Sequence, residues 1–381
     1  MNTTRLPAIG ITCYPSAGGS GVIATELGLN LARSGYTVHF ISSSIPLRLQ
    51  RYQQNVFYHQ VDVANYPVFA HPPYTLSLAS AMSEVAQRYA LDILHVHYAI
   101  PHAASAFLAQ QMVGSERLKV ITTLHGTDIT LVGQEPTFFP ITRFLIERSD
   151  AVTAVSGFLK RETERVFGTT RPIDVIPNFV DTRHYHPEGC RERRSWFATP
   201  DQKVILHASN FRKVKNVPAV IEVFARVQQE VPCKLVLAGD GPELPAVRDQ
   251  VDALGLSEVV DFVGQIDDLA ELLPCADLVL LPSWHESFGL IALEAMSCGV
   301  MVIATDRGGT DEFIDDGTNG FLRDPEDVTG MAAAALRVLR DDPLRKQMAE
   351  EARRDAVEHF GARCVLKQYV ALYDRVVGQG G

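Results

Sequence analysis

The sequence predicts an α/β protein with two units, each built on a parallel sheet that helices cover on both faces. Three observations lead to this prediction. The chain has 381 residues, which suggests two to three domains at about 150 residues each. Short apolar runs alternate with amphipathic segments of helical length, a pattern typical of strands buried on both faces. The alternation pauses at the polar, irregular stretch 178–199 and then restarts.

In the first half, short runs of apolar residues mark the strands. We expect strands at 8–14, 37–42, 93–97, 119–125, 151–155 and 173–176. Amphipathic segments between them predict helices, among them 20–33, 101–113 and 137–148.

The second half repeats this style. Its apolar runs predict strands at 204–208, 234–238, 259–262, 278–281 and 301–304. Helices are expected at 217–231, 243–254 and 288–297, and the pattern from 326 to 377 is helical almost throughout. These patterns indicate domains at 1–180 and 181–360, with the terminal helix within 361–381 crossing back onto the first domain.

Charge is distributed unevenly between the two halves. The formal net charge is -10, which disfavours a nucleic-acid binder. Residues 1–180 hold 13 Lys/Arg and 12 Asp/Glu, a net of +1, whereas residues 181–381 hold 22 and 33, a net of -11. An anionic ligand of the second half therefore needs a local group of cations.

Six cysteines are scattered, with no two closer than 23 residues. This spacing favours free thiols in a reducing compartment over a disulfide framework or a zinc site. The first residues resemble a strand more than a signal peptide, and no run of about 18 apolar residues is present. We therefore expect a cytoplasmic protein without stable membrane insertion.

Glycines follow the first expected strand in the string Gly18-Gly19-Ser20-Gly21. Glycine lets a ligand approach the backbone, and the start of the next helix offers N–H groups to an anion. The string is neither GxGxxG nor a Walker motif. A plain strand–helix turn is the alternative interpretation.

Polar residues follow another strand in Leu124-His125-Gly126-Thr127-Asp128. His125 and Thr127 can hydrogen-bond to a substrate at the carboxyl end of that strand. Asp128 could simply cap the next segment, and a lone histidine is often structural.

A basic loop, Asn210-Phe211-Arg212-Lys213-Val214-Lys215, follows the first strand of the second half. Residues 202–218 hold four Lys/Arg and no acidic residue, within a half whose net charge is -11. Arginine and lysine at a strand end suit a diphosphate. A solvated run of charges is the alternative.

Two glutamates flank a helix start in Glu286-Ser287-Phe288-Gly289-Leu290-Ile291-Ala292-Leu293-Glu294. We expect Glu286 above the helix, Glu294 about two turns into it, and backbone N–H groups facing an anion. Alternatively, Glu286 is a favourable first-turn charge and Glu294 a surface residue.

Together, the Glu-x7-Glu string, the basic loop and the glycine-rich loop resemble the family-4 retaining glycosyltransferases, over nearly the whole chain. The resemblance implies the GT-B fold, in which two Rossmann-like domains face a central cleft. The strings GGSGVIATELG (18–28), HVHYAIPHA (95–103), TTLHGTDITLVG (122–133) and SNFRKVKN (209–216) are similar to the bacillithiol-pathway branch of that family.

This resemblance implies transfer of GlcNAc from UDP-GlcNAc to the hydroxyl of L-malate, with retention at the anomeric carbon. The first domain would then bind the acceptor and the second the nucleotide sugar. Catalytic roles are implied for Glu286, His125, Arg212 and Lys215. In the family an arginine often stands five residues before the lysine; here that position is Asn210, so Arg212 would act from a shifted place.

The resemblance also implies the binding residues. Donor contacts would come from Gly18, Gly19, Asn210, Arg212, Lys215, Gly239, Asp240, Gly264, Gln265, Glu286, Ser287, Phe288, Gly289, Leu290 and Glu294. Candidates for the acceptor carboxylates, chosen near strand ends in the first half, are Ser16, Tyr98, Thr127, Arg143 and Asn178.

No cofactor is expected, since UDP-GlcNAc is a substrate, and the absence of a DxD-type motif predicts no required metal. The family implies front-side attack with the donor phosphate taking the proton, and it suggests a homodimer. A sister enzyme with an inositol phosphate or lipid acceptor is the first alternative. A dinucleotide-dependent oxidoreductase or a nucleotide-binding module is the second, although GxGxxG is missing.

Overall fold

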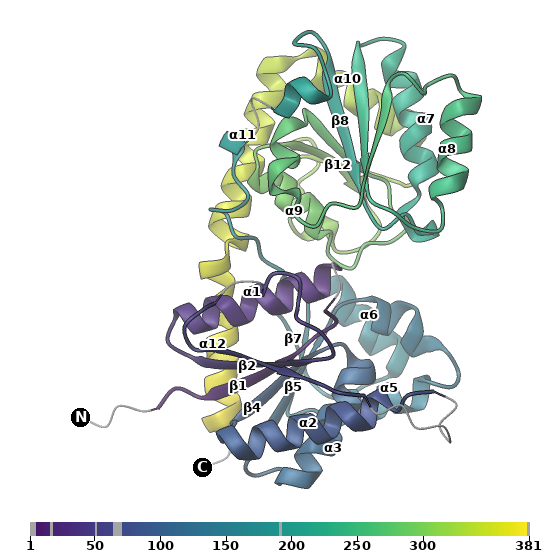
Figure 1. The fold of residues 1–381 in the computed structure, drawn as a ribbon. Coiled ribbons are helices and arrows are strands. Elements are labelled where there is room, and N and C mark those ends of the chain that lie inside the picture. Colours follow the sequence, from purple (N-terminus) through teal and green to yellow (C-terminus); the bar gives the residue numbers. More distant parts are fainter. Residues whose placement is uncertain (1–4, 16–17, 50–51, 64–70, 190–192, 379–381) are drawn as a thin grey trace. The chain divides into compact units, whose positions relative to one another are not determined.

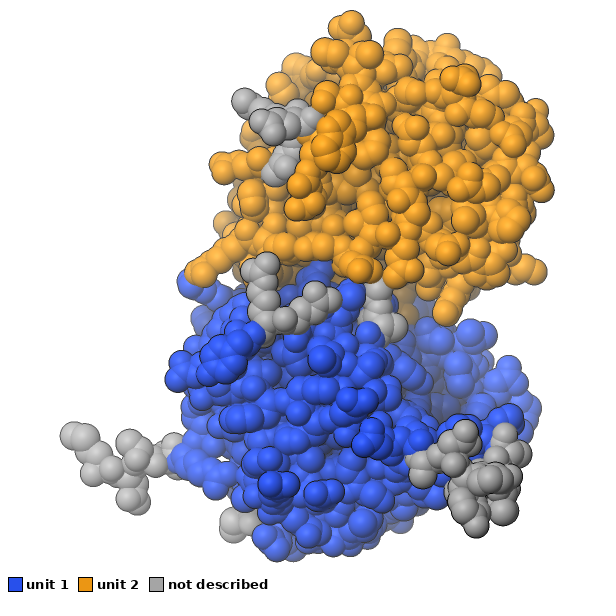
Figure 2. Space-filling model, viewed as in Figure 1, with its two compact units in different colours: residues 1–178, 362–381 blue, residues 179–361 orange. Residues whose placement is uncertain are grey.

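A computed structural model describes residues 5–15, 18–49, 52–63, 71–189 and 193–378. The chain forms two compact units: unit 1 comprises residues 1–178 and 362–381, and unit 2 comprises residues 179–361 (Figure 2). Each unit contains one parallel sheet (Figure 1). The chain therefore passes from one unit to the other twice.

Unit 1 has a seven-stranded sheet in the order β3-β2-β1-β4-β5-β6-β7. Its strands are β1 (Ala8–Thr12), β2 (Thr37–Ser42), β3 (Val56–Gln60), β4 (Ile93–His97), β5 (Lys119–Leu124), β6 (Ala151–Ala154) and β7 (Ile173–Val175). Its helices are α1 (Gly19–Arg33), α2 (Tyr74–Tyr89), α3 (Ala104–Val113), α4 (Thr127–Thr130), α5 (Phe139–Arg148), α6 (Gly157–Phe167) and α12 (Ala362–Gly378). Helices α2 and α3 pack together on one face, and α1 packs beside α12 (Figure 1).

Unit 2 has a six-stranded sheet in the order β10-β9-β8-β11-β12-β13. Its strands are β8 (Lys203–Ala208), β9 (Cys233–Ala238), β10 (Val260–Gly264), β11 (Leu278–Leu281), β12 (Met301–Thr305) and β13 (Phe321–Arg323). Its helices are α7 (Val217–Gln228), α8 (Leu244–Ala253), α9 (Leu290–Ser297), α10 (Val328–Arg340) and α11 (Asp342–Phe360). The core of this unit is formed by apolar residues of β8, β9, β11, β12, α7 and α10.

The edge strands β3 and β13 were not expected from the sequence. In β3 the residues are half-buried or exposed, and β13 has three residues of which one is fully buried. Such strands lack the continuous apolar run of a central strand. Their pairing with β2 and β12 becomes visible only in the folded sheet.

An aspartate ties the two central strands of unit 1 at their amino ends. The N–H of Ala8 in β1 donates to Asp92 Oδ2 (2.7 Å), and the N–H of Asp92 donates to the Ala8 carbonyl (2.9 Å). Asp92 precedes β4 directly. Its carboxylate is 36% exposed and lies 3.7 Å from Arg5.

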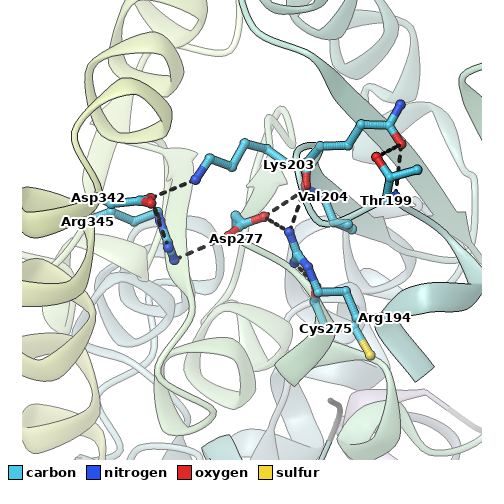
Figure 3. Close-up of polar contacts among 9 residues, drawn as sticks. Arg194, Thr199, Lys203, Val204, Cys275, Asp277, Asp342 and Arg345 are labelled. Atoms are coloured by element: carbon cyan, nitrogen blue, oxygen red, sulfur yellow. Dashed lines mark hydrogen bonds and ion pairs between the residues drawn. The ribbon is translucent and has the colours of Figure 1, made fainter. Parts of the chain in front are cut away.

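Asp277 makes the same pair of contacts in unit 2, in a buried setting. The N–H of Val204 in β8 donates to Asp277 Oδ2 (2.8 Å), and the N–H of Asp277 donates to the Val204 carbonyl (2.8 Å). Arg194 also donates to Oδ2 (2.6 Å), and Arg345 lies 3.4 Å from Oδ1 (Figure 3). The Asp277 side chain is 8% exposed, so two arginines neutralise a nearly buried charge.

The expectation that all cysteines are free thiols does not hold for every cysteine of the chain. Cys13, Cys233, Cys298 and Cys364 are free, but Cys275 is disulfide-bonded. Cys190 lies outside the described residues. The expectation is wrong at Cys275 because sequence spacing does not report which side chains folding brings together.

None of the helices, as far as the chain is described, is long and apolar enough to cross a membrane.

Candidate functional site

In each sheet the strand order reverses between two central strands. These strands are β1 and β4 in unit 1, and β8 and β11 in unit 2. Parallel sheets with this order bind ligands beyond the carboxyl ends of the strands at the reversal. The predicted site residues cluster in the loops that follow these strands and their neighbours.

Lys215 and Glu286, predicted separately, are joined in unit 2. Lys215 follows β8 and donates through Nζ to Glu286 Oε1 (2.6 Å). Ser283, which follows β11, donates to the same oxygen (2.8 Å). Both charged side chains are partly buried, at 23% and 15% exposure. The arrangement places one cation and one carboxylate side by side at the strand reversal.

The Glu286 loop is held by the backbone after β12. The Glu286 N–H donates to the Arg307 carbonyl (3.1 Å), and the Gly309 N–H donates to the Glu286 carbonyl (2.9 Å). Gly308 lies between them with φ +136°, and a Cβ there would come within 1.9 Å of Glu286 O. Glycine is therefore required at 308 for both backbone conformation and space.

The basic loop presents its other predicted residues to solvent. Arg212 and Asn210 are exposed, and their side chains have no hydrogen-bond partner among the residues that the structure describes. The loop is tied to the β11 loop because the Trp284 N–H donates to the Val214 carbonyl (2.8 Å). Arg212 is thus available for an anion without breaking an existing pair.

The loop after β9 lies against the basic loop. Gly239 has φ +134°, and a Cβ there would approach the Ser209 carbonyl oxygen to 1.8 Å. The Gly239 N–H donates to the Gly264 carbonyl (2.7 Å), which joins the ends of β9 and β10. Asp240 and Gln265 are exposed beside them. Four predicted donor residues therefore share one edge of the sheet with the Ser209 loop.

Helix α9 begins after Gly289, which has φ +94°. Its first turn carries no acidic residue, and Ser287 and Leu290 are partly exposed there. Phe288 is buried and stacks on Phe313, with ring centroids 5.0 Å apart. We therefore expect Phe288 to contribute through its backbone.

Glu294 lies inside α9 and is 5% exposed. The alternative interpretation of Glu294 as a surface residue is therefore excluded. A carboxylate is rarely buried without a polar role.

In unit 1, Gly18 is the N-cap of α1 and Gly19 its first residue. The Gly18 carbonyl accepts from the N–H groups of Gly21 and Val22 (3.0 and 3.2 Å). The first turn carries no acidic residue, which leaves the positive end of the helix dipole open to an anion. Ser16 lies outside the described residues.

Tyr98 and His125 lie together beyond β4 and β5. Their rings stack with centroids 5.6 Å apart, and Tyr98 has a strained φ of +90°. Thr127 opens the short helix α4, two residues after His125, and is partly exposed. Strained backbone away from glycine requires support from its surroundings, and functional sites are where it concentrates.

Asp128 provides that support. Its Oδ2 accepts from the Ala99 N–H (3.0 Å), and its Oδ1 accepts from the N–H groups of Gly126 (2.9 Å) and His125 (3.2 Å). Burial raises the pKa of Asp128, while these three N–H groups lower it. The carboxylate thus pins the Tyr98 loop to the His125 loop, beyond the capping role considered from the sequence.

Several histidines surround this point. His97 Nδ1 lies 2.8 Å from His125 Nε2, and His95 hydrogen-bonds to Tyr373 of α12 (2.7 Å) and to Thr123 (2.7 Å). Burial lowers the pKa of His95 and of His125 to about 3, and that of His97 well below its usual value. The histidines are therefore neutral near pH 7 and act as hydrogen-bonding groups.

Two predicted acceptor residues stand apart from this group. Arg143 is exposed on α5, and no hydrogen bond joins it to Tyr98 or Thr127 as far as the structure describes the chain. Asn178 is 6% exposed, and its Oδ1 is buried without a hydrogen-bond partner among the described residues.

Several positioning residues could not be recognised from the sequence. His97 stands within the string HVHYAIPHA, but strand periodicity alone makes it a core residue. Ser283 and Gly308 belong to no motif, and only their proximity to Glu286 in the fold reveals them.

Comparison with known proteins shows the family to which the chain belongs. Residues 17–184 match the family described as Glycosyltransferase Family 4, and residues 191–355 match Glycosyl transferases group 1. N-acetyl-alpha-D-glucosaminyl L-malate synthase of Bacillus anthracis is 48% identical over 366 residues, which cover 96% of each chain. The chain belongs to the family-4 glycosyltransferases.

More distant glycosyltransferases are similar over most of the chain. A glycogen synthase of Mycobacterium tuberculosis is 28% identical over 74% of this chain and 68% of its own length. The sucrose-phosphate synthase of Thermosynechococcus elongatus has a TM-score of 0.82 at 20% identity, covering 98% of this chain and all of the other. Anabaena HepE in complex with UDP and glucose has a TM-score of 0.81 at 20% identity, covering 96% and 99%. These likenesses confirm the predicted GT-B fold of the glycosyltransferase.

Proposed function

We propose that this glycosyltransferase moves GlcNAc from UDP-GlcNAc to the hydroxyl of L-malate with retention, the first step of bacillithiol biosynthesis. The observation that carries the proposal is the 48% identity, over 96% of both chains, with a protein named for this product. A cytoplasmic location and a homodimer remain predictions.

The Lys215–Glu286 pair supports the donor side of the proposal. In a retaining transfer, negative charge develops on the leaving diphosphate, and a preorganised cation stabilises it. Lys215 is held by a carboxylate and lies beside the exposed Arg212, so both can face a diphosphate. Glu286 is an acceptor and suits the hydroxyls of a sugar, while the buried Glu294 suits those of the ribose.

Unit 1 supports the acceptor side. A small dicarboxylate needs N–H or O–H donors, and Tyr98, Thr127 and the free N–H groups of α1 supply them. Arg143 and Asn178 are proposed as further contacts. Front-side attack with proton transfer to the donor phosphate is proposed because the family implies it.

The test is an acceptor panel with purified full-length protein and UDP-GlcNAc. We expect UDP release and a GlcNAc–malate mass with L-malate, and none with succinate, which has both carboxylates but no hydroxyl. Inositol phosphate and lipid acceptors form the competing arm. Product with one of these and none with L-malate would assign the sister function, while the anomeric coupling in the NMR spectrum reports retention. Unchanged rates in EDTA are expected if no metal is required.

A further inference from the structure

The ring of His125 faces a second histidine ring inside unit 1. His97 Nδ1 and His125 Nε2 are 2.8 Å apart, and the ring centroids are 5.0 Å apart at 29°. His97 is fully buried, whereas His125 is partly exposed at the end of β5. The distance is that of a hydrogen bond, so one of the two nitrogens carries the proton between them.

Both rings are neutral. Burial lowers the pKa of His125 to about 3 and that of His97 well below its usual value. A neutral imidazole carries one N–H. Whichever ring donates in this pair therefore has a bare nitrogen at its other position.

The surroundings of His97 Nε2 show which of the two rings donates the hydrogen bond. His97 Nε2 is buried and has no hydrogen-bond partner among the residues described. If His125 donated, His97 would carry its proton on Nε2, as a buried N–H without an acceptor, which folded proteins rarely tolerate. If His97 donates from Nδ1, Nε2 keeps a bare lone pair.

His102, next to this pair, has the same tautomer, with its proton on Nδ1. Its Nδ1 lies 2.6 Å from the His97 carbonyl oxygen, which can only accept, so Nδ1 carries the proton. Its Nε2 is likewise buried and without a partner among the described residues. This small layer of the core therefore holds bare ring nitrogens and no orphaned N–H.

We propose that His97 is a positioning residue that donates to His125 Nε2 and so fixes His125 as a donor, through Nδ1–H, to a ligand oxygen. Without His97, a neutral His125 could present either a donor or an acceptor. The direction of this hydrogen bond is independent of the substrate. Naming a hydroxyl of the donor sugar as the ligand oxygen rests on the function proposed above.

The direct test is long-range ¹H–¹⁵N NMR of the full chain labelled with ¹⁵N-histidine, with His125 assigned from a His125→Gln variant. We expect the proton of His125 on Nδ1, and a shift toward Nε2–H in His97→Leu. His97→Asn, whose amide can donate from the place of Nδ1, should restore the Nδ1–H form. A wild-type His125 protonated on Nε2, or an unchanged tautomer in His97→Leu, would overturn the proposal.

Kinetics separate positioning from a general structural role. His97→Leu should lower kcat/KM for UDP-GlcNAc by about tenfold, the size of one hydrogen bond, with recovery in His97→Asn. His39→Leu is the matched control, because His39 Nδ1 lies at the same 2.8 Å from His59 Nε2 at the far edge of the sheet. Equal losses in both leucine variants would refute positioning. Absence of GlcNAc transfer in the wild type would refute the proposed function and leave the NMR result intact.

Discussion

The two units share one sheet design but organise their strand ends by different forces. Unit 1 uses buried histidines, since four of the five among the described residues lie there, together with an aspartate, Asp128, that is held by backbone N–H groups rather than by a cation. Unit 2 uses ion pairs, with Lys215 on Glu286 at the carboxyl ends and two arginines on Asp277 at the amino ends. The same sheet topology can thus carry different chemistry at its strand ends. The two units should therefore lose stability or activity in response to different substitutions and changes of pH.

The sharpest contrast is between the equivalent aspartates. Asp277→Ala removes the nearly buried carboxylate that Arg194 and Arg345 share, although Arg345 keeps its pair with Asp342 and Arg194 keeps two backbone carbonyls. The loss of charged hydrogen bonds and of the backbone contact should destabilise unit 2 by about 2–3 kcal/mol. Asp92→Ala removes the same backbone contact from a more exposed carboxylate, so about 1 kcal/mol is expected. Urea unfolding of both variants measures the difference. Equal losses would mean that the backbone contact alone matters.

At the carboxyl ends, Lys215→Ala should lower kcat by about 10²–10³-fold, as for removal of one transition-state donor. Lys213→Ala is the control, because Lys213 is an exposed lysine of the same loop. Steady-state kinetics with varied UDP-GlcNAc distinguish the variants. A loss in Lys213→Ala as large as in Lys215→Ala would show that general loop charge, and not the paired lysine, is needed.

In unit 1 the corresponding organiser is Asp128. Asp128→Asn replaces one accepting oxygen by an NH2 group against backbone N–H donors, which should cost about 1–3 kcal/mol and release the Tyr98 loop. We expect lower stability and a higher KM for L-malate. Asp174→Asn, which breaks an exposed pair with Arg375, should change neither appreciably. An Asp128→Asn enzyme with native KM and stability would contradict this role.

Low pH should destabilise unit 1 more than unit 2. His95, His97 and His102 are fully buried with lowered pKa values, so below about pH 6.5 the unfolded state binds protons that the folded state does not. Stability is therefore present above about pH 6.5 and falls as the pH falls toward the folded pKa values, about 3 for His95 and about 4 for His102. Each ring contributes up to about 1.4 kcal/mol per pH unit.

Among the described residues of unit 2, His207 is the one buried histidine, and burial lowers its pKa to about 4. Hydrogen exchange followed by mass spectrometry from about pH 7 to about pH 5 should therefore show unit 1 opening first. Earlier opening of unit 2 would contradict the assignment of neutral histidines to unit 1.

Much of the fold could be predicted from local pattern. Central strands are continuous apolar runs, so β1, β4, β8 and β11 stood out, whereas the half-exposed β3 did not. The loops after these strands could be named because parallel sheets place ligands there. The disulfide at Cys275 could not be predicted, because spacing carries no distance.

What the sequence determined by itself is the alternation of strands and helices, the motif strings and the family they resemble, because these depend on neighbours in the chain. Tertiary structure alone decided which side chains meet. Lys215 reaches Glu286 across 71 residues and His97 reaches His125 across 28. Each pair lies at the carboxyl ends of two neighbouring strands, β8 and β11 in one unit and β4 and β5 in the other. Hydrogen bonds act over about 3 Å, so their partners are set by where folding places the strand ends.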